Sequence, residues 1–513
     1  MRYAPLCPTR LKKMRGSQFV LLALAGWLSA CALDAVWAQP KTTKGKTTSG
    51  PAAGHGAPGG AGAPGMRPPA TKGAGATPKA GGAATTPPVP VDPATGLPLG
   101  YDPKKSPTEL MTMEKPLATE DQIAKWKKDT KNLAEYRKAL RNADLSPAGK
   151  AVLTMGIKYR LALMTLKENQ QDLHKLREDL TVRDQTDAAS VPALKPDVVR
   201  AFRRWFLEEV AKETEPLLDN NLYVRIQAAT LLGELVLMPA DEEKKQKLET
   251  FTPPVDMLRK VIRNPDQPLA VKIPAARSMI RLIRYGDLPA PKRFEVMKDV
   301  LAELTSPNAK TEPKTHYWYE MRLVEVLSTL DTPLDLETRR PVMVEKLTEI
   351  VRDPQRHWHV RAEAAKALGR VPLDPQVNVA SLLHDVMQLT LDMAKAAQQS
   401  PKAPHWKLTF WKLYLTFQPK DKDERNAAKN APAGLLKNPS AGNAAQQPYQ
   451  LVVPLVNAVI NSEPITAEHL KAVEDWLQKN KGLAGVASGP TRSTLTNGAT
   501  ATNAAAVGGA NTP

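Results

Sequence analysis

The chain of 513 residues contains only two cysteines, Cys7 and Cys31, and both lie within its first 38 residues. If that segment is removed during export, the mature chain has no thiol. Disulfides, cysteine-based zinc sites, covalent haem attachment and thiol catalysis are then excluded together. A folded region without such cross-links must be stabilised by the apolar packing of its own core.

Two further absences restrict the fold and the function. Segments with the pattern of β-strands are nearly missing, which argues against barrels and doubly wound sheets. No apolar run after residue 38 approaches eighteen residues, so no membrane-spanning helix is expected there. Motifs of nucleotide-binding, phosphate-binding, serine-hydrolase and zinc-protease sites are also missing. We therefore expect no catalytic residues, no cofactor and no metal site.

The first 38 residues have the pattern of a signal peptide. Basic residues precede an apolar run from Phe19 to Leu28, and small residues stand one and three positions before a cut after Ala38. The apolar run is too short to be a convincing membrane span. We expect cleavage after Ala38 and export of the remaining chain to the periplasm, the cell envelope or the medium.

A second interpretation of this segment competes with the first. The sequence Leu28-Ser-Ala-Cys31 matches the bacterial lipobox, in which the Cys31 thiol is lipidated and becomes the new N-terminus. The chain would then be anchored to a membrane at Cys31, and without lipidation no membrane contact is expected. The start is open as well, because Met14 gives a more compact signal than Met1.

The segments around the predicted core contain few large apolar residues. Residues 39–105 are rich in Pro, Gly, Ala and Thr, and residues 481–513 in Ala, Thr, Asn and Gly, so we expect a disordered linker and a disordered tail. Residues 418–447 are predicted to be a loop insertion. The ends of the chain carry most of the net charge of +18, which leaves +6 for residues 106–480. This modest charge argues against a nucleic-acid partner and allows weak attraction to an anionic polymer.

A pattern that occurs twice is the strongest indication of the fold. It has the form Val-Arg-x-x-Ala-Ala-x-x-Leu-Gly, within residues 221–233 and again within 357–369. The paired small residues let a helix approach its neighbours closely, and the leucine fills the seam between them. Gly233 and Gly369 are expected to end their helices in a left-handed conformation.

The basic residue of this pattern recurs along the chain at intervals of 47, 50, 39 and 46 residues. The five positions are Arg225, Lys272, Arg322, Arg361 and Lys407. Stretches with helical apolar spacing lie between them, so each interval holds a first helix, a turn and a second helix. Intervals of about 40–47 residues are typical of repeats with two or three helices.

The chain resembles the HEAT-repeat family of armadillo-like α-solenoids over residues 197–480. The resemblance is close at 221–233 and 357–369 and partial at 268–283, where Pro274 interrupts the pattern. It is weak at 316–330 and 405–417, where aromatic and β-branched residues replace the alanines. It implies an all-α fold in which stacked helical hairpins form a binding platform, here in an exported bacterial protein, and it implies no catalytic residues. We therefore predict an α-solenoid of about five hairpins.

Residues 106–196 precede the predicted repeats and have a different pattern. Thr119 is a predicted helix start, and Ser146, which is followed by a proline, begins a second helix that the apolar spacing extends to Leu180. We expect residues 119–184 to form a helical hairpin that caps the repeats, or else one more degenerate repeat.

Aromatic and histidine residues recur where the second helices of three successive repeats begin. On one edge of a solenoid they would bind a sugar or peptide ligand, or they would fill the seams between hairpins. We favour the seams, with at least two of the three tryptophans buried and with His357 and His405 exposed at the rim. The candidate partner-binding aromatic residues are Tyr223, Trp318, Trp358 and Trp406.

The five recurring cations also allow two interpretations. They would form a basic stripe, or each would pair with an acid or a carbonyl group of a neighbouring repeat and fix the stacking angle. We favour pairing, and the available acids are Glu234, Glu325 and Glu363.

A pair of histidines, His357 and His359, is the one sequence feature that suggests a metal ligand set. Two residues apart on a helix, these side chains should point away from each other. They would converge only if the turn were extended at that point, so no metal site is predicted.

These observations favour a non-catalytic scaffold of the cell envelope that holds a protein partner on its surface. The alternative is a binding module for an anionic or sugar polymer of the cell surface, which would use the basic stripe and the aromatic side chains. No arrangement of catalytic residues was found that would support an enzyme.

Overall fold

The computed structural model describes residues 111, 113–129, 133–243, 245–305, 313–418 and 434–483. All of these residues belong to one compact unit within Pro88–Pro513. The predicted signal peptide with Cys31 and Ala38, the linker 39–105 and most of the tail 481–513 lie outside the described residues.

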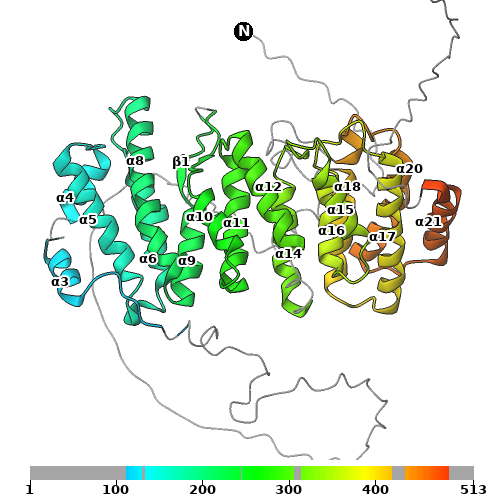
Figure 1. The fold of residues 1–513 in the computed structure, drawn as a ribbon, viewed down its shortest axis with the longest axis horizontal. Helices are drawn as coiled ribbons and strands as arrows, with labels where there is room; N and C mark the ends of the chain where they lie inside the picture. Colours follow the sequence, from blue (N-terminus) through cyan, green and yellow to red (C-terminus); the bar gives the residue numbers. More distant parts are fainter. Residues whose placement is uncertain are drawn as a thin grey trace, which may run out of the picture. The chain divides into compact units, whose positions relative to one another are not determined.

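The described part of the chain is mostly helical, as the sequence predicts (Figure 1). The first helices are α3 (Glu120–Asp129), α4 (Leu133–Arg141), α5 (Pro147–Leu163), η3 (Lys167–Asn169), α6 (Leu173–Glu178), the π-helix η4 (Asp179–Asp184) and α7 (Gln185–Asp187). The next are α8 (Pro196–Thr214), η5 (Glu215–Asp219), α9 (Leu222–Gly233), α10 (Val255–Arg263), α11 (Leu269–Tyr285), α12 (Ala290–Thr305) and α14 (Pro313–Leu327). The last are α15 (Val342–Arg352), α16 (Trp358–Leu368), α17 (Val379–Gln399), α18 (His405–Phe417), η6 (Leu435–Lys437), α20 (Gln446–Asn461), α21 (Ala467–Lys479) and η7 (Lys481–Leu483).

Strands form a minor part of the described chain. Strands β1 (Val236–Met238) and β2 (Glu249–Thr250) pair antiparallel in a short ladder after α9. None of the described helices combines the length and the apolar composition that are needed to cross a bilayer.

Several helices begin where the sequence predicts. The backbone N–H of Gln122 donates to the Thr119 hydroxyl and the backbone N–H of Thr119 donates to the Gln122 side chain, which caps the start of α3. Ser146 accepts from the backbone N–H of Gly149 and caps α5. Helix α11 continues through Pro274, the residue that interrupts the repeat pattern in the sequence.

The helix predicted from Ser146 to Leu180 is wrong, because α5 ends at Leu163. Polar side chains donate hydrogen bonds to the backbone carbonyl groups at the C-terminal end of α5. The Thr165 hydroxyl donates to the carbonyl of Ala162 over 2.7 Å, and the Asn169 amide donates to that of Leu163 over 2.8 Å. Such local hydrogen bonds compete with a continuing helix, and the apolar spacing does not report them.

Two series of helices pack in sequence order. In one series α9 packs against α11, α11 against α14, α14 against α16, α16 against α18 and α18 against α20. In the other α10 packs against α12, α12 against α15, α15 against α17 and α17 against α21. Helices α10, α12 and α15 also pack against the helices that follow them, α11, α14 and α16 (Figure 1). The beginnings of α14, α16 and α18 therefore belong to adjacent helices of the first series.

The prediction that Gly233 and Gly369 adopt a left-handed conformation is wrong. Among the described glycines, Gly434 is the one with a positive φ angle. Gly233 and Gly369 instead allow close approach, since a Cβ atom on Gly233 would lie less than 3.0 Å from Ser278, and one on Gly369 would lie less than 3.0 Å from the carbonyl oxygen of Thr416. Each glycine thus lets its helix, α9 or α16, contact the next helix of the series.

Candidate functional site: an aromatic–histidine cluster

The residues with the most distinctive surroundings gather at the beginnings of α14, α16 and α18. We call them the aromatic–histidine cluster: Tyr317, Trp318, His357, Trp358, His359, His405 and Trp406. Tyr317 and Trp318 lie in α14, His357 is the N-cap of α16, and His405 is the first residue of α18. The three segments are far apart in the sequence and are brought together by helix packing.

The rings of the cluster form a continuous series of contacts. Tyr317 stacks on His357 with 4.0 Å between the ring centroids and lies 5.4 Å from Trp318. His405 lies 6.2 Å from His357 and 4.3 Å from Trp406. The series ends at Trp358, which lies 5.9 Å from Trp406 and carries the Arg361 guanidinium above its ring. Contacts of this kind are favourable beyond their buried area.

The expectation that His357 and His359 point apart is wrong, because their ring centroids lie 5.2 Å apart. His357 is not within the helix. As the N-cap of α16 it has an extended backbone, with φ −60° and ψ 143°, and its Nδ1 accepts from the backbone N–H of His359 over 3.2 Å. The two side chains therefore converge through an extended turn, which is the one condition under which the sequence allowed them to do so. Among the described residues, no group of three or more His, Cys, Asp or Glu side chains is arranged to hold a metal ion.

The expectation that at least two of the three tryptophans are buried is wrong as well. Trp406 is 3% exposed, Trp358 is half-buried and Trp318 is 46% exposed. The three positions are not equivalent, because Trp318 lies five residues inside α14 whereas Trp358 and Trp406 lie at the first turn of their helices. Trp406 therefore fills the seam, and Trp318 presents its ring to solvent. Tyr223 is 40% exposed in the first turn of α9, a helix that does not take part in the cluster.

His359 is fixed in one tautomer by its neighbours. The Thr409 hydroxyl donates its single proton to the carbonyl of His405 over 2.7 Å. Its oxygen also lies 3.2 Å from Nδ1 of His359, so that nitrogen carries the proton and donates to it. His359 is 8% exposed, whereas His357 and His405 are half-buried and not exposed at a rim as the sequence predicted.

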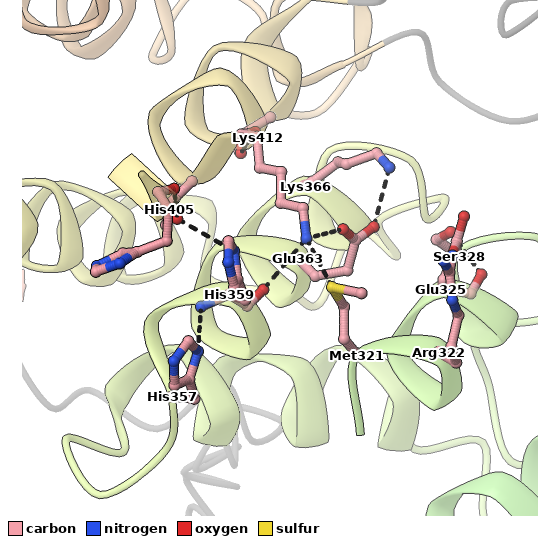
Figure 2. A network of polar contacts seen from close by, with 12 residues as sticks. Met321, Arg322, Glu325, Ser328, His357, His359, Glu363, Lys366, His405 and Lys412 are labelled. Atoms are coloured by element: carbon pink, nitrogen blue, oxygen red, sulfur yellow. Dashed lines mark hydrogen bonds and ion pairs between the residues drawn. The ribbon is translucent and has the colours of Figure 1, made fainter. Parts of the chain in front are cut away.

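A buried ion pair lies beside His359 (Figure 2). The Lys412 ammonium lies 2.8 Å from the Glu363 carboxylate, 3.0 Å from Sδ of Met321 and 3.5 Å from the carbonyl of His359. Glu363 also contacts Lys366 over 2.9 Å. Burial would raise the pKa of Glu363, but the two lysines outweigh it and hold that pKa well below its usual range.

All three histidines of the cluster are held in the neutral form. Burial, helped by the Lys412 charge and the other histidines, lowers the pKa of His359 from 6.5 to about 3. Burial and then the charges of His405 and Lys412 lower the pKa of His357, and burial lowers that of His405. These pKa values fall because a buried imidazolium loses its hydration and would face the positive charge of Lys412.

Four of the five recurring cations have hydrogen-bond or ion-pair partners. Two of the three acids that were predicted to pair with them, Glu234 and Glu363, pair with other cations instead. Arg322 pairs with Glu325, one of the predicted acids, but the pair lies within α14 and does not join neighbouring repeats. Glu234 pairs with Arg177, and Glu363 pairs with Lys366 and Lys412. The remaining contacts join neighbouring elements: Arg225 with the carbonyl of Asn220 and with Gln267, Lys272 with Glu303, and Arg361 with the carbonyl of Val351 and with Asp392.

Lys407 differs from the other four cations. It is half-buried in α18, and no ion pair to it is found among the described residues. Neither Lys412 nor Thr409 was predicted from the sequence to belong to the site, although both form hydrogen bonds with residues of the cluster. One signal was available, since Lys412 is a lone cation inside the apolar stretch of α18, a place where lysine is rare unless it is paired.

A small cavity lies elsewhere, between the segment before α3 and helices α6 and α9. Its volume is about 140 Å³, and Met111, Met113, Met164 and Leu173 are among its lining residues. Pockets for small-molecule ligands usually have volumes of about 300–1,000 Å³.

Comparisons of the chain with family models, curated proteins and solved structures found no match.

Proposed function

We propose that the chain is a non-catalytic scaffold of the HEAT-like α-solenoid type that binds a protein partner. The order of packing supports this architecture, since each helix of the two series packs against the next one in sequence order. The two copies of the repeat pattern lie in α9 and α16, and each contacts the next helix through a glycine that leaves no room for a Cβ atom. Repeats of this kind create extended surfaces suited to macromolecular partners.

The exposure of Trp318 beside half-buried, stacked rings is the observation that carries the proposed binding surface. Trp318 is 46% exposed and contacts Tyr317, which stacks on His357. Trp406 on the same cluster is buried and fixes the position of the neighbouring rings. An exposed tryptophan held by a rigid base is typical of residues that dominate the binding energy of protein interfaces.

The pairing of the recurring cations argues against the alternative, a module that binds an anionic polymer. Its basic stripe requires free positive charges at Arg225, Lys272, Arg322 and Arg361, but each of these has a carboxylate or carbonyl partner. A location in the cell envelope remains part of the proposal and depends on the export pattern of residues 1–38.

Substitution of Trp318 tests the proposal. Immobilised full-length chain is exposed to an envelope extract at about 0.5 M salt, at which exposed charge contacts are screened. We expect a defined protein to be retained by the wild type, and its affinity for the Trp318→Ala chain to fall about thirtyfold or more, as for an interface hot spot. Tyr285→Ala is the matched control, because Tyr285 is 39% exposed but lies at the end of α11, outside the cluster.

The control should bind as the wild type does. Equal retention by the wild type and the Trp318→Ala chain would contradict the proposed surface. Retention of polysaccharide in place of protein, lost at the same salt concentration, would favour the polymer module instead.

A further inference from the structure

The side chain that caps α16 is a histidine, so this cap can titrate. Its acceptor is a ring nitrogen, Nδ1 of His357, which receives the backbone N–H of His359 over 3.2 Å. A proton on that nitrogen removes the acceptor, so the cap is lost. It also places a positive charge at the N-terminus of a helix, where the aligned peptide dipoles are already positive. Acid therefore acts against this helix start in two ways.

Two more histidines add to the same effect. His405 is the first residue of α18, so its protonation also places a positive charge at a helix N-terminus. His359 is buried between the two helices and lies 3.2 Å from the Thr409 hydroxyl of α18. The three ring centroids are 5.2 to 6.2 Å apart, so each added proton makes the next one less favourable.

The charged groups around the cluster offer no compensation. Lys412 of α18 lies 3.5 Å from the carbonyl of His359, Lys407 lies on the same helix, and the Arg361 guanidinium lies above the Trp358 ring. The carboxylates on the elements around α16 are already used by cations. Those on α16, α17 and the end of α15 are Glu363 with Lys366 and Lys412, Asp392 with Arg361, Asp385 with Arg352, and Asp353 with Arg356. Those on α14 and within α15 are Glu320 with Arg356, Glu325 with Arg322, Glu345 with Arg340, and Glu349 with Lys346.

The other copy of the repeat pattern provides an internal reference. Asn221 occupies the position in α9 that His357 occupies in α16, three residues before the valine of the pattern. Its side chain accepts from the backbone N–H of Val224 and caps the helix. An amide does not titrate, so this cap is the same at pH 4 and at pH 7.

We infer that the histidines of the aromatic–histidine cluster form an acid-sensitive latch, which uncaps α16 and loosens it from α18 when they are protonated. Loosening would disturb the base that holds Tyr317 and Trp318 and would release a partner bound there. The release of a partner by acid rests on the proposed function. The opening of α16 by acid is a property of the free chain and does not depend on that function, so the free chain is used to test it.

Hydrogen exchange of the full-length chain measures the latch. Exchange of residues 358–361, corrected for the intrinsic effect of pH, is compared at pH 7 and pH 4.5. We expect their opening equilibrium to rise about fivefold or more on acidification, which corresponds to the loss of one N-cap. In His357→Asn, which carries the cap residue of α9, the rise should be smaller. The variant His174→Asn is the control, because His174 is exposed and lies outside the cluster.

Exchange at the C2 position of each histidine ring gives a second measurement that needs no variant. We expect the three cluster histidines to titrate below pH 6.5, the ordinary pKa of the side chain. Titration of all three at or above that pH, or equal acid responses of the wild type and His357→Asn, would overturn the inference. An acid response in a chain that retains no partner would contradict the proposed function alone, and partner binding without an acid response would contradict the latch alone.

Discussion

Helices α9 and α16 carry the same ten-residue pattern but lie in different chemical surroundings. Both contact the next helix through a glycine, at Ser278 and at Thr416 respectively. Helix α9 is capped by an amide, whereas α16 is capped by a histidine and buries the Glu363 carboxylate between two lysines. The fixed positions of the pattern thus determine the helix and its approach to a neighbour, and its variable positions together with the cap residue determine the chemistry.

The largest expected effect concerns the buried ion pair, which α9 lacks at its equivalent position. Glu363→Leu leaves Lys412 buried without its carboxylate and should lower the free energy of unfolding by about 3–5 kcal/mol. The double variant Glu363→Leu with Lys412→Met removes both charges and should recover most of that loss. Chemical denaturation measures both. A single variant as stable as the wild type would show that the pair is solvated.

The two glycines sharpen the comparison of the two contacts. Gly369→Ala places a methyl group against a backbone oxygen, which cannot rotate away, and should cost about 2–3 kcal/mol. At Gly233 the nearest atoms belong mainly to the Ser278 side chain, so Gly233→Ala should cost less and should be partly rescued by Ser278→Gly. Thermal unfolding of the three variants tests this order, and equal losses without rescue would contradict it.

Much of the helical content follows from the sequence, but the contacts between helices do not. Periodicity and capping residues predict α9, α16 and the starts at Thr119 and Ser146. The end of α5 at Leu163 depends on side-chain hydrogen bonds that leave no trace in apolar spacing. The roles of Gly233 and Gly369 depend on the next helix and not on local conformation.

The candidate site was predicted in outline and not in detail. Recurrence of aromatic and histidine residues at the starts of successive helices correctly indicates a shared edge. Exposure of each tryptophan depends on its depth in its own helix, and the choice of partner for Glu234 or Glu363 depends on distances across the packing. A single sequence without coordinates does not contain those distances.

His359 should make the stability of the chain depend on pH. Its folded pKa, about 3, lies below the unfolded value of 6.5, so its neutral form stabilises the fold fully above pH 6.5 and loses this effect as the pH falls. Between pH 7.5 and 4.5 the wild type should therefore lose about 2–3 kcal/mol more than His359→Gln, whose amide can still donate to Thr409. Denaturation curves at the two pH values measure the difference. A His359→Gln chain with the same pH dependence as the wild type would contradict the assignment.

The smallest expected effect on stability tests the central claim most directly. The claim is that the repeat pattern makes α9 and α16 equivalent and that the cap residue, three positions before the pattern, makes α16 sensitive to acid. Asn221→His places the cap of α16 on α9 and should change the free energy of unfolding at pH 7 by about 1 kcal/mol or less. Hydrogen exchange of residues 222–225 at pH 7 and pH 4.5 is the measurement. We predict that α9 acquires an acid-dependent opening that the wild-type helix lacks, and an unchanged response of these residues to pH would contradict the account.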